Sequence, residues 1–161
     1  MSIELDGSVR HEVVVDLPQE EAFRAFTDMD RIKPREHNML AVPIEQTVLE
    51  QHVGGDVYDR GIDGSRCRWG RVLTFNPPAV LAFSWDIGPD WQVTSNLTRT
   101  SEVEVTFTPD GPDRTTVVLV HRHLEHHGEG WQGMRDGVDV DDGWPLYLAR
   151  YQAFTAEEAP S

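Results

Sequence analysis

Five side chains that can bind a metal or carry a proton crowd into residues 121 to 127: His121, His123, Glu125, His126 and His127. On a strand, His121 and His123 would share one face, at a spacing that lets two imidazoles bind one metal ion. A zinc site needs a third protein ligand, and the sequence lacks the helical HExxH motif. We therefore expect a strand end that runs into a polar loop, with no metal and no cofactor.

His121 is the member of this group with the clearest chemical potential. One alternation places it inside the fold together with Val117 and Leu119, and the other turns Val118 and Val120 inward. Both faces are apolar in the middle, so periodicity does not choose between them. If His121 points inward, it can orient a ligand or act as a general base, because an imidazole titrates near neutral pH.

Arg71 is the second candidate for chemistry. It shares a strand face with Trp69 and Phe75, and on a concave face it would be a cation in an apolar pocket, suited to a carboxylate or enolate oxygen. The favoured alternative turns Val72 inward and leaves Arg71 in solvent or paired with an acidic residue. Tyr58 raises the same question on the preceding strand.

Composition restricts the possible partners. Twenty-eight acidic residues face 14 basic ones, a formal net charge of −14, which disfavours nucleic acids and anionic membrane surfaces. Cys67 is the single cysteine, so we expect a structural thiol and no intramolecular disulfide. No stretch is long and apolar enough for membrane insertion, and no signal peptide is visible, so a cytoplasmic location fits best.

Short segments rich in β-branched and aromatic residues predict seven strands. They are Val9–Leu17, Ile44–His52, Val57–Ile62, Arg66–Phe75, Val80–Ile87, Ser101–Thr108 and Thr115–Leu124. Asp63-Gly64 between two of them is a strong hairpin signal. We read the 161 residues as a single domain with its core at about 9–154.

Two helices accompany these strands. After Pro18, Ala22, Phe23 and Phe26 recur at helical spacing and predict an amphipathic helix of about three turns. A final helix begins at Trp144, with Leu148 and Tyr151 on its inner face. The polar stretch 125–143 predicts a loop, and 30–42 a loop or a short helix.

This order predicts an α+β fold in which a curved antiparallel sheet of about six or seven strands wraps around a long C-terminal helix. An antiparallel meander buries one face and needs a cover, which the final helix supplies. The space between sheet and helix can stay partly unfilled, and a ligand would sit there.

Several short motifs together resemble one known family. They are Gly54-Gly55, Asp63-Gly64, Trp69-Gly70-x-Val72, Pro77-Pro78, Leu81, Trp85, Val103-x-Val105-x-Phe107, Thr116-x-Val118-x-Val120-His121 and Gly143-Trp144. In order and spacing they resemble the START-like (SRPBCC, helix-grip) superfamily, in the branch of the C-terminal domain of the activator of heat-shock-protein-ninety ATPase. The loop 32–38 departs from the family, which often carries tryptophans there.

The resemblance implies a helix-grip fold with a cavity between sheet and terminal helix, and it supplies no shared catalytic motif. The superfamily includes lipid carriers, hormone receptors and polyketide aromatase/cyclases. The eukaryotic co-chaperones of the branch carry a further amino-terminal domain, for which these 161 residues have no room. Co-chaperone activity is therefore a minor alternative.

Three functions follow as hypotheses. The first is binding of a small apolar ligand, lipid-like or polyketide-like, in the cavity. The second is a cyclase, dehydratase or hydrolase that uses His121 or Arg71, and the third is an interaction protein with a filled core. A homodimer through an exposed edge strand is possible. The expected ligand-binding residues are Tyr58, Trp69, Arg71, Phe83, Trp85, His121, Trp144, Leu148 and Tyr151.

Overall fold

Seven strands pair edge to edge into one antiparallel sheet in the computed structural model of the chain, which describes residues 3–4 and 6–158. The order across the sheet is β1-β7-β6-β5-β4-β3-β2. The strands are β1 (Val9–Val15), β2 (Ile44–Leu49), β3 (Asp56–Gly61), β4 (Arg66–Asn76), β5 (Val80–Trp85), β6 (Ser101–Pro109) and β7 (Thr115–Arg122). The expected antiparallel sheet is confirmed.

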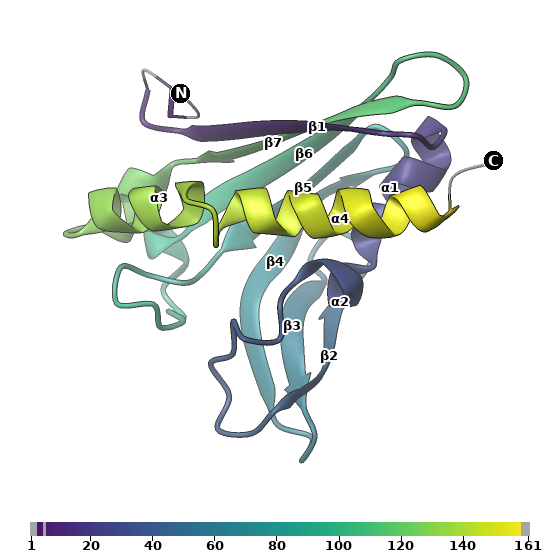
Figure 1. Ribbon diagram of the computed structural model, residues 1–161. Coiled ribbons are helices and arrows are strands. Elements are labelled where there is room, and N and C mark those ends of the chain that lie inside the picture. Colours follow the sequence, from purple (N-terminus) through teal and green to yellow (C-terminus); the bar gives the residue numbers. More distant parts are fainter. Residues whose placement is uncertain (1–2, 5, 159–161) are drawn as a thin grey trace.

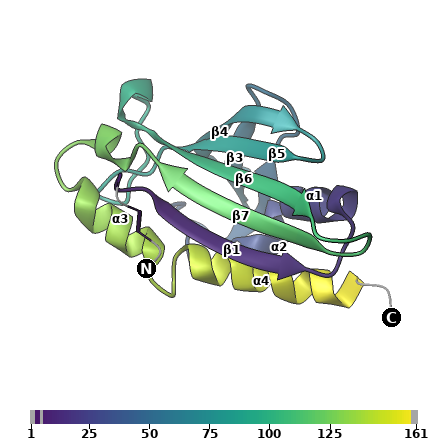
Figure 2. The same ribbon diagram turned by 90° about the horizontal axis from the view of Figure 1, so that it is seen from above.

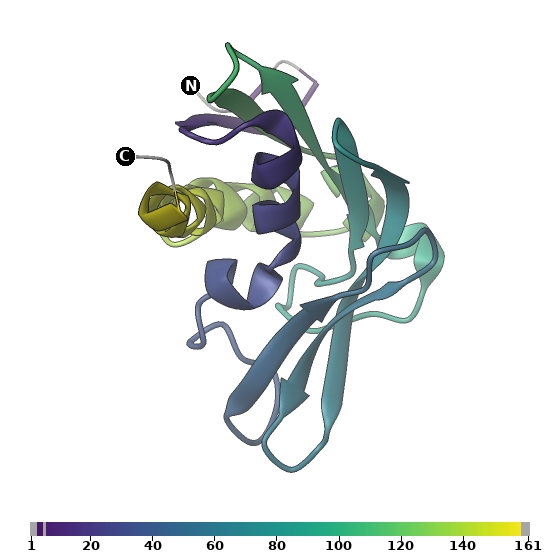
Figure 3. The same ribbon diagram turned by 90° about the vertical axis from the view of Figure 1, so that its right-hand side faces the viewer.

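Helices cover the concave side of this sheet. The α-helices are α1 (Gln19–Thr27), α2 (Met29–Ile32), α3 (Trp131–Asp139) and α4 (Trp144–Glu158). The connections between elements also contain two short 3-10 helices, η1 (Leu97–Arg99) and η2 (Leu124–His127). The 15-residue α4 runs alongside β1 (Figures 1 and 2). Figure 3 shows α4 end-on, with α1 between it and the sheet. The predicted helix-grip arrangement is confirmed.

The inward face of β7 carries Val117, Leu119 and His121, all with 0% exposure. The pairing with β6 explains this choice, because it sets Val117 opposite Phe107 and His121 opposite Val103, both of which are buried. Residues opposite each other in a sheet share a face. The question that the sequence leaves open is therefore decided in favour of an inward His121.

On β4 neither of the two simple alternations holds. Trp69 and Val72 are both buried, whereas Leu73 is exposed. The pairing with β3 shifts register between Arg68 and Gly70, which leaves Trp69 as an extra residue and exchanges the faces that follow it, so Trp69 and Val72 both point inward. The pairing with β5 shifts register again between Val72 and Thr74. Arg71 comes before this shift and stays partly exposed, with its backbone N–H donating to Ser84 Oγ at 2.9 Å.

The prediction of a loop over 125–143 was wrong, because α3 lies within it. Met134 and Val138 are buried and Trp131 packs on the same core, so one helical face is apolar. Gly133 and Gly137 inside the helix weaken the local helical signal. Packing against the core compensates for the poor propensity of this segment.

Aromatic rings from α1, α4 and β6 form the centre of the core. Phe23 and Phe26 both meet Phe107 edge to face, at centroid distances of 5.0 and 5.8 Å, and Tyr151 packs on Phe26 at 5.1 Å. The Tyr151 hydroxyl donates to the Ala22 carbonyl at 2.7 Å, which fixes α4 to α1. No helix in the described part of the chain is long and apolar enough to cross a membrane.

Candidate functional site

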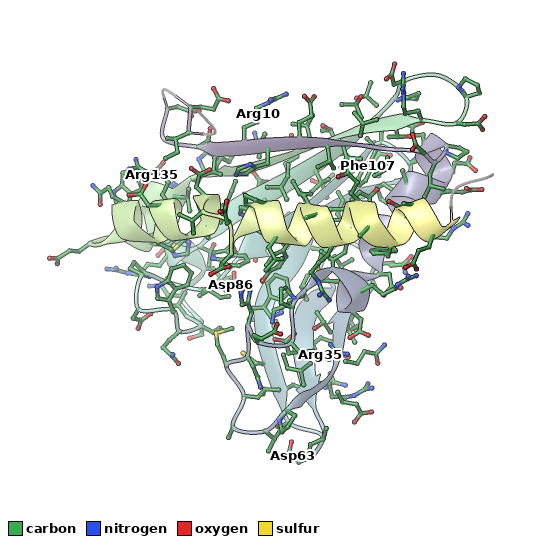
Figure 4. The ribbon with its side chains drawn as sticks, viewed as in Figure 1. Arg10, Arg35, Asp63, Asp86, Phe107 and Arg135 are labelled. Carbon is green, nitrogen blue, oxygen red and sulfur yellow. The ribbon has the colours of Figure 1, made fainter. Side chains whose placement is uncertain are left out.

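A cavity of about 540 Å³ lies beside the first turn of α4. Three segments that are distant in sequence enclose it: the loop after α2, the end of β5 with its following loop, and the junction of α3 with α4. In Figure 4, Asp86, which follows the last residue of β5, is labelled below this junction. The lining residues are Lys33, His37, Asn38, Met39, Leu40, Trp85, Ile87, Trp91, Gln92, Gly137, Val138, Asp142, Gly143, Trp144 and Tyr147.

Aromatic side chains make up much of the cavity wall. Trp144 meets Trp85 and Tyr147 edge to face, at centroid distances of 5.2 and 5.1 Å. Trp91 belongs to the loop after β5 and presses on Gly137 of α3, where an added Cβ would lie 2.7 Å from the indole ring. Only glycine admits the ring at this distance. The cavity lining therefore includes broad, rigid apolar surfaces from β5, from the loop that follows it and from α4.

One atom of this wall is a hydrogen-bond donor without a partner. Trp85 is 5% exposed, and its Nε1 makes no hydrogen bond within the described residues. A buried N–H without an acceptor costs free energy, of the order of 1–3 kcal/mol.

The cavity lining is polar where the loop after α2 approaches strands β2 and β3. Lys33 lines the cavity, is 2% exposed and forms an ion pair with the fully buried Asp59, with 3.0 Å between Nζ and Oδ2. Thr47 donates a hydrogen bond to the other carboxylate oxygen at 2.7 Å. Burial lowers the pKa of Lys33, and the charge of Asp59 opposes that shift.

A second polar pair joins the same loop to α4. His37 Nδ1 and the Tyr147 hydroxyl are 2.8 Å apart, and both residues line the cavity. Burial lowers the pKa of His37 and, as the largest cause, raises the pKa of Tyr147. At neutral pH the pair therefore consists of a neutral imidazole and a neutral phenol.

Behind the aromatic wall lies a chain of buried hydrogen bonds around His121. Trp144 Nε1 donates to His121 Nδ1 at 3.0 Å, so the proton of the neutral ring is on Nε2, which lies 2.7 Å from Ser101 Oγ. Ser101 Oγ is 2.8 Å from His127 Nε2. Burial lowers the pKa of His121 to about 3 and that of His127 to about 4. With both ring nitrogens engaged, His121 fixes the orientation of the Trp144 indole.

The nine expected ligand-binding residues fall into three groups. Trp85 and Trp144 line the cavity. Five others are buried in the interior and do not line the cavity: Trp69, Phe83, His121, Leu148 and Tyr151. Tyr58 in β3 and Arg71 in β4 do not line the cavity. The guanidinium of Arg66 covers the Tyr58 ring, 4.5 Å from its centroid.

Sequence reasoning missed Lys33, His37, Trp91 and Tyr147. Three of them lie in loops without periodicity, where no pattern reports which side chains face a cavity. Tyr147 follows Trp144 by three residues on α4, so helical spacing from Trp144 could have identified it.

The histidine group near the end of β7 divides between the interior and the surface. His123 has a φ of 63° and leaves the strand, so it shares no site with the inward His121. Within the described residues, His123, Glu125 and His126 form an exposed group whose ligand atoms lie within 4.8 Å of one another. Exposed groups of this kind are common without an ion, and the expectation of no metal stays a prediction.

Known proteins resemble this chain in both sequence and fold. The family model described as Activator of Hsp90 ATPase homolog 1-like protein matches residues 16–155. The structure of Txn09, an anthrahydroquino-γ-pyrone synthase complexed with SUM, is similar at 35% identity and a TM-score of 0.63, over 91% of this chain and 95% of that one. CalC from Micromonospora echinospora, a self-sacrificing resistance protein, has 26% identity and a TM-score of 0.68, over 98% and 99% of the two chains.

A more distant structure agrees in fold alone. NE0264 from Nitrosomonas europaea is 12% identical, with a TM-score of 0.68 over 97% of this chain and 98% of that one. No match to the chain is found among the curated proteins.

Proposed function

The chain belongs to the family of Activator of Hsp90 ATPase homolog 1-like proteins, and from that premise we propose that it binds a flat, largely apolar small molecule in the cavity beside α4. The observation that carries the proposal is the wall of Trp85, Trp144 and Tyr147, with Trp91 as a further aromatic residue of the cavity lining. Rigid aromatic surfaces favour a ligand with fused rings, because ring-to-ring packing adds to the gain from apolar burial.

The size and chemistry of the cavity support this proposal. Sites for small molecules typically have volumes of about 300–1,000 Å³ and combine apolar walls with a few polar groups. At about 540 Å³, the cavity has room for a molecule of three or four fused rings. Its polar lining consists of Lys33, His37, Asn38, Gln92 and Asp142 together with the hydroxyl of Tyr147, and most of the remaining lining side chains are apolar.

The relatives add a second line of support. Txn09, 35% identical over nearly the whole chain, is a synthase of an anthrahydroquino-γ-pyrone, and its structure is a complex. An aromatic polyketide-like ligand is therefore the class we propose for this chain. Enzymatic roles for His121 or Arg71 gain no support from the geometry, since neither lines the cavity. The two other hypotheses are a co-chaperone of the heat-shock ATPase and an interaction protein without a ligand. No contact described above favours either of them.

The test is a titration of the purified protein with 9,10-anthraquinone, followed by native mass spectrometry. We expect one bound molecule in the wild type, and affinity at least about tenfold weaker in Leu40→Trp, which fills part of the cavity with an indole ring. Leu97→Trp is the matched control, since Leu97 is exposed in η1 and away from the cavity. Absence of saturable binding, or equal binding by Leu40→Trp, would contradict the proposal.

A further inference from the structure

The hydrogen-bonded pair of His37 and Tyr147 joins two elements that are far apart in sequence, the loop after α2 and the first turn of α4. Both side chains line the cavity, and Tyr147 is 5% exposed. Tyr151, one turn further along α4, bonds instead to the Ala22 carbonyl and lies outside the cavity lining. Two buried tyrosines on one helix thus have different surroundings.

The pair always presents one donor and one acceptor to the cavity. If His37 Nδ1–H donates to Tyr147, the Tyr147 O–H is free to donate and His37 Nε2 is free to accept. If Tyr147 donates to Nδ1, its oxygen accepts and Nε2–H donates. Within the described residues, His37 Nε2 makes no hydrogen bond. A ligand hydroxyl, which is itself a donor and an acceptor, matches either arrangement.

A buried cation lies next to this pair. The Lys33 ammonium bonds to the carbonyl oxygen of His37 and pairs with Asp59, which accounts for two of its three hydrogens. The charge of Lys33 acts on His37, as do those of Glu36 and Asp142 with the opposite sign. Because Lys33 lines the cavity, an oxygen that gains negative charge there has a cation close by.

We propose that His37, Tyr147 and Lys33 form a subsite for an acidic ligand hydroxyl, a phenol or an enol, and that the subsite removes its proton. This inference rests on the proposed function, because it needs a ligand in the cavity. In the proton transfer, the ligand O–H bond breaks and a bond from hydrogen to His37 Nε2 forms. His37 is partly exposed, and because partial burial and Lys33 beside it disfavour an imidazolium, it passes the proton to solvent and returns to the neutral form. The electron pair stays on the ligand oxygen, beside the Lys33 ammonium and the Tyr147 O–H. The ligand is thereby held as a phenolate or enolate, the nucleophilic form of such molecules.

Two probes that differ by one hydroxyl test the subsite: 9,10-anthraquinone and 2-hydroxyanthraquinone. We expect the wild type to bind the hydroxylated probe at least about tenfold more tightly at neutral pH. In the bound state its phenolate absorption band should appear at a pH about one unit lower than in free solution, which is a tenfold change in the ionisation constant. Tyr147→Phe and His37→Phe should both reduce the affinity ratio of the probes towards one.

The matched control is Tyr151→Phe, which makes the same chemical change on the same helix and should keep the ratio and the absorption shift. If neither probe binds the wild type, the proposed function is overturned together with the subsite. If both probes bind with equal affinity, or if Tyr147→Phe and His37→Phe keep the wild-type ratio, the subsite alone is overturned. An unchanged absorption band with a high affinity ratio would overturn the proton transfer.

Discussion

Lys33 and Asp59 form an ion pair that is almost completely removed from solvent, at one end of the cavity. Burial of two charges is costly, and the pair persists because each member has further partners. Thr47 and Trp69 both donate to Asp59 Oδ1, at 2.7 and 3.4 Å, and the His37 carbonyl accepts from Lys33. The pair thus joins the loop after α2 to β2, β3 and β4, and positions the loop that carries His37.

Replacement of Lys33 by methionine tests the strength of this arrangement. The variant leaves the Asp59 carboxylate buried without its cation, and we expect a loss of about 3–5 kcal/mol in the free energy of unfolding. Arg35→Met is the matched control, because Arg35 pairs with Asp30 at 2.7 Å on the exposed surface, where such a pair contributes about 0–1 kcal/mol. Urea unfolding measures both, and equal losses in the two variants would contradict the argument.

At the scale of elements, the cavity depends on the junction between α3 and α4. Gly143 sits at this junction, and a Cβ added there would lie 2.1 Å from the carbonyl oxygen of Val138. Both residues line the cavity, and Trp144 follows directly. The close approach of the two helices is therefore what brings the first turn of α4, with Trp144 and Tyr147, against the cavity.

Gly143→Ala should force the two helices apart. We expect a loss of at least about 2 kcal/mol in the free energy of unfolding, because the added carbon meets backbone and not a flexible side chain. Gly133→Ala in α3 is the control: no atom lies within 4 Å of its added Cβ, and alanine favours the helix by up to about 1 kcal/mol. Thermal or urea unfolding distinguishes the two, and a neutral Gly143→Ala would contradict this account of the junction.

The helices and strands also show how much of the fold and of the cavity could be predicted from the sequence. Strand alternation in Ser101–Pro109 and helical spacing from Trp144 are local patterns, and they predicted β6 and α4 correctly. The face of β7 depended on its register with β6, and the faces of β4 on register shifts, neither of which a single strand records. The cavity is mostly built from loops brought together by the fold. Its wall was predicted only in Trp85 and Trp144, which belong to regular elements.

At the scale of the whole molecule, the pH of the solution acts on the fold through its buried histidines. His121 and His127 are buried and neutral, with folded-state pKa values of about 3 and about 4 against an ordinary value of 6.5. Burial also lowers the pKa of His37. Carboxylates such as Asp30 and Asp86 shift in opposite directions, lowered and raised, but from an ordinary value of 3.8. Between pH 6.5 and about 4.5, His121 and His127 titrate in the unfolded chain and stay neutral in the folded protein.

Acidification in this range should destabilise the protein. Below pH 6.5 the unfolded chain takes up protons on His121 and His127 while the folded protein does not, so the free energy of unfolding falls as the pH falls. The loss ends only near pH 4 for His127 and near pH 3 for His121, where the folded state binds the same protons. From pH 7 to pH 5 we expect a decrease of roughly 4 kcal/mol from these two histidines, because each contributes about 1.4 kcal/mol for each pH unit below pH 6.5.

Urea unfolding at the two pH values measures this decrease. Variants of two neighbouring histidines show which side chain causes it. His127→Gln removes the contribution of one histidine, so the difference between pH 7 and pH 5 should shrink by about 2 kcal/mol, whatever the variant does to stability at either pH. His126→Gln changes an exposed side chain beside it, and it should keep most of the difference, because burial is the larger cause of the lowered pKa of His127 and the charge of His126 the smaller one. A difference that is the same in all three proteins would mean that His127 is protonated in the folded state. The hydrogen bond from Ser101 would then need the opposite direction, because a protonated imidazole no longer accepts it.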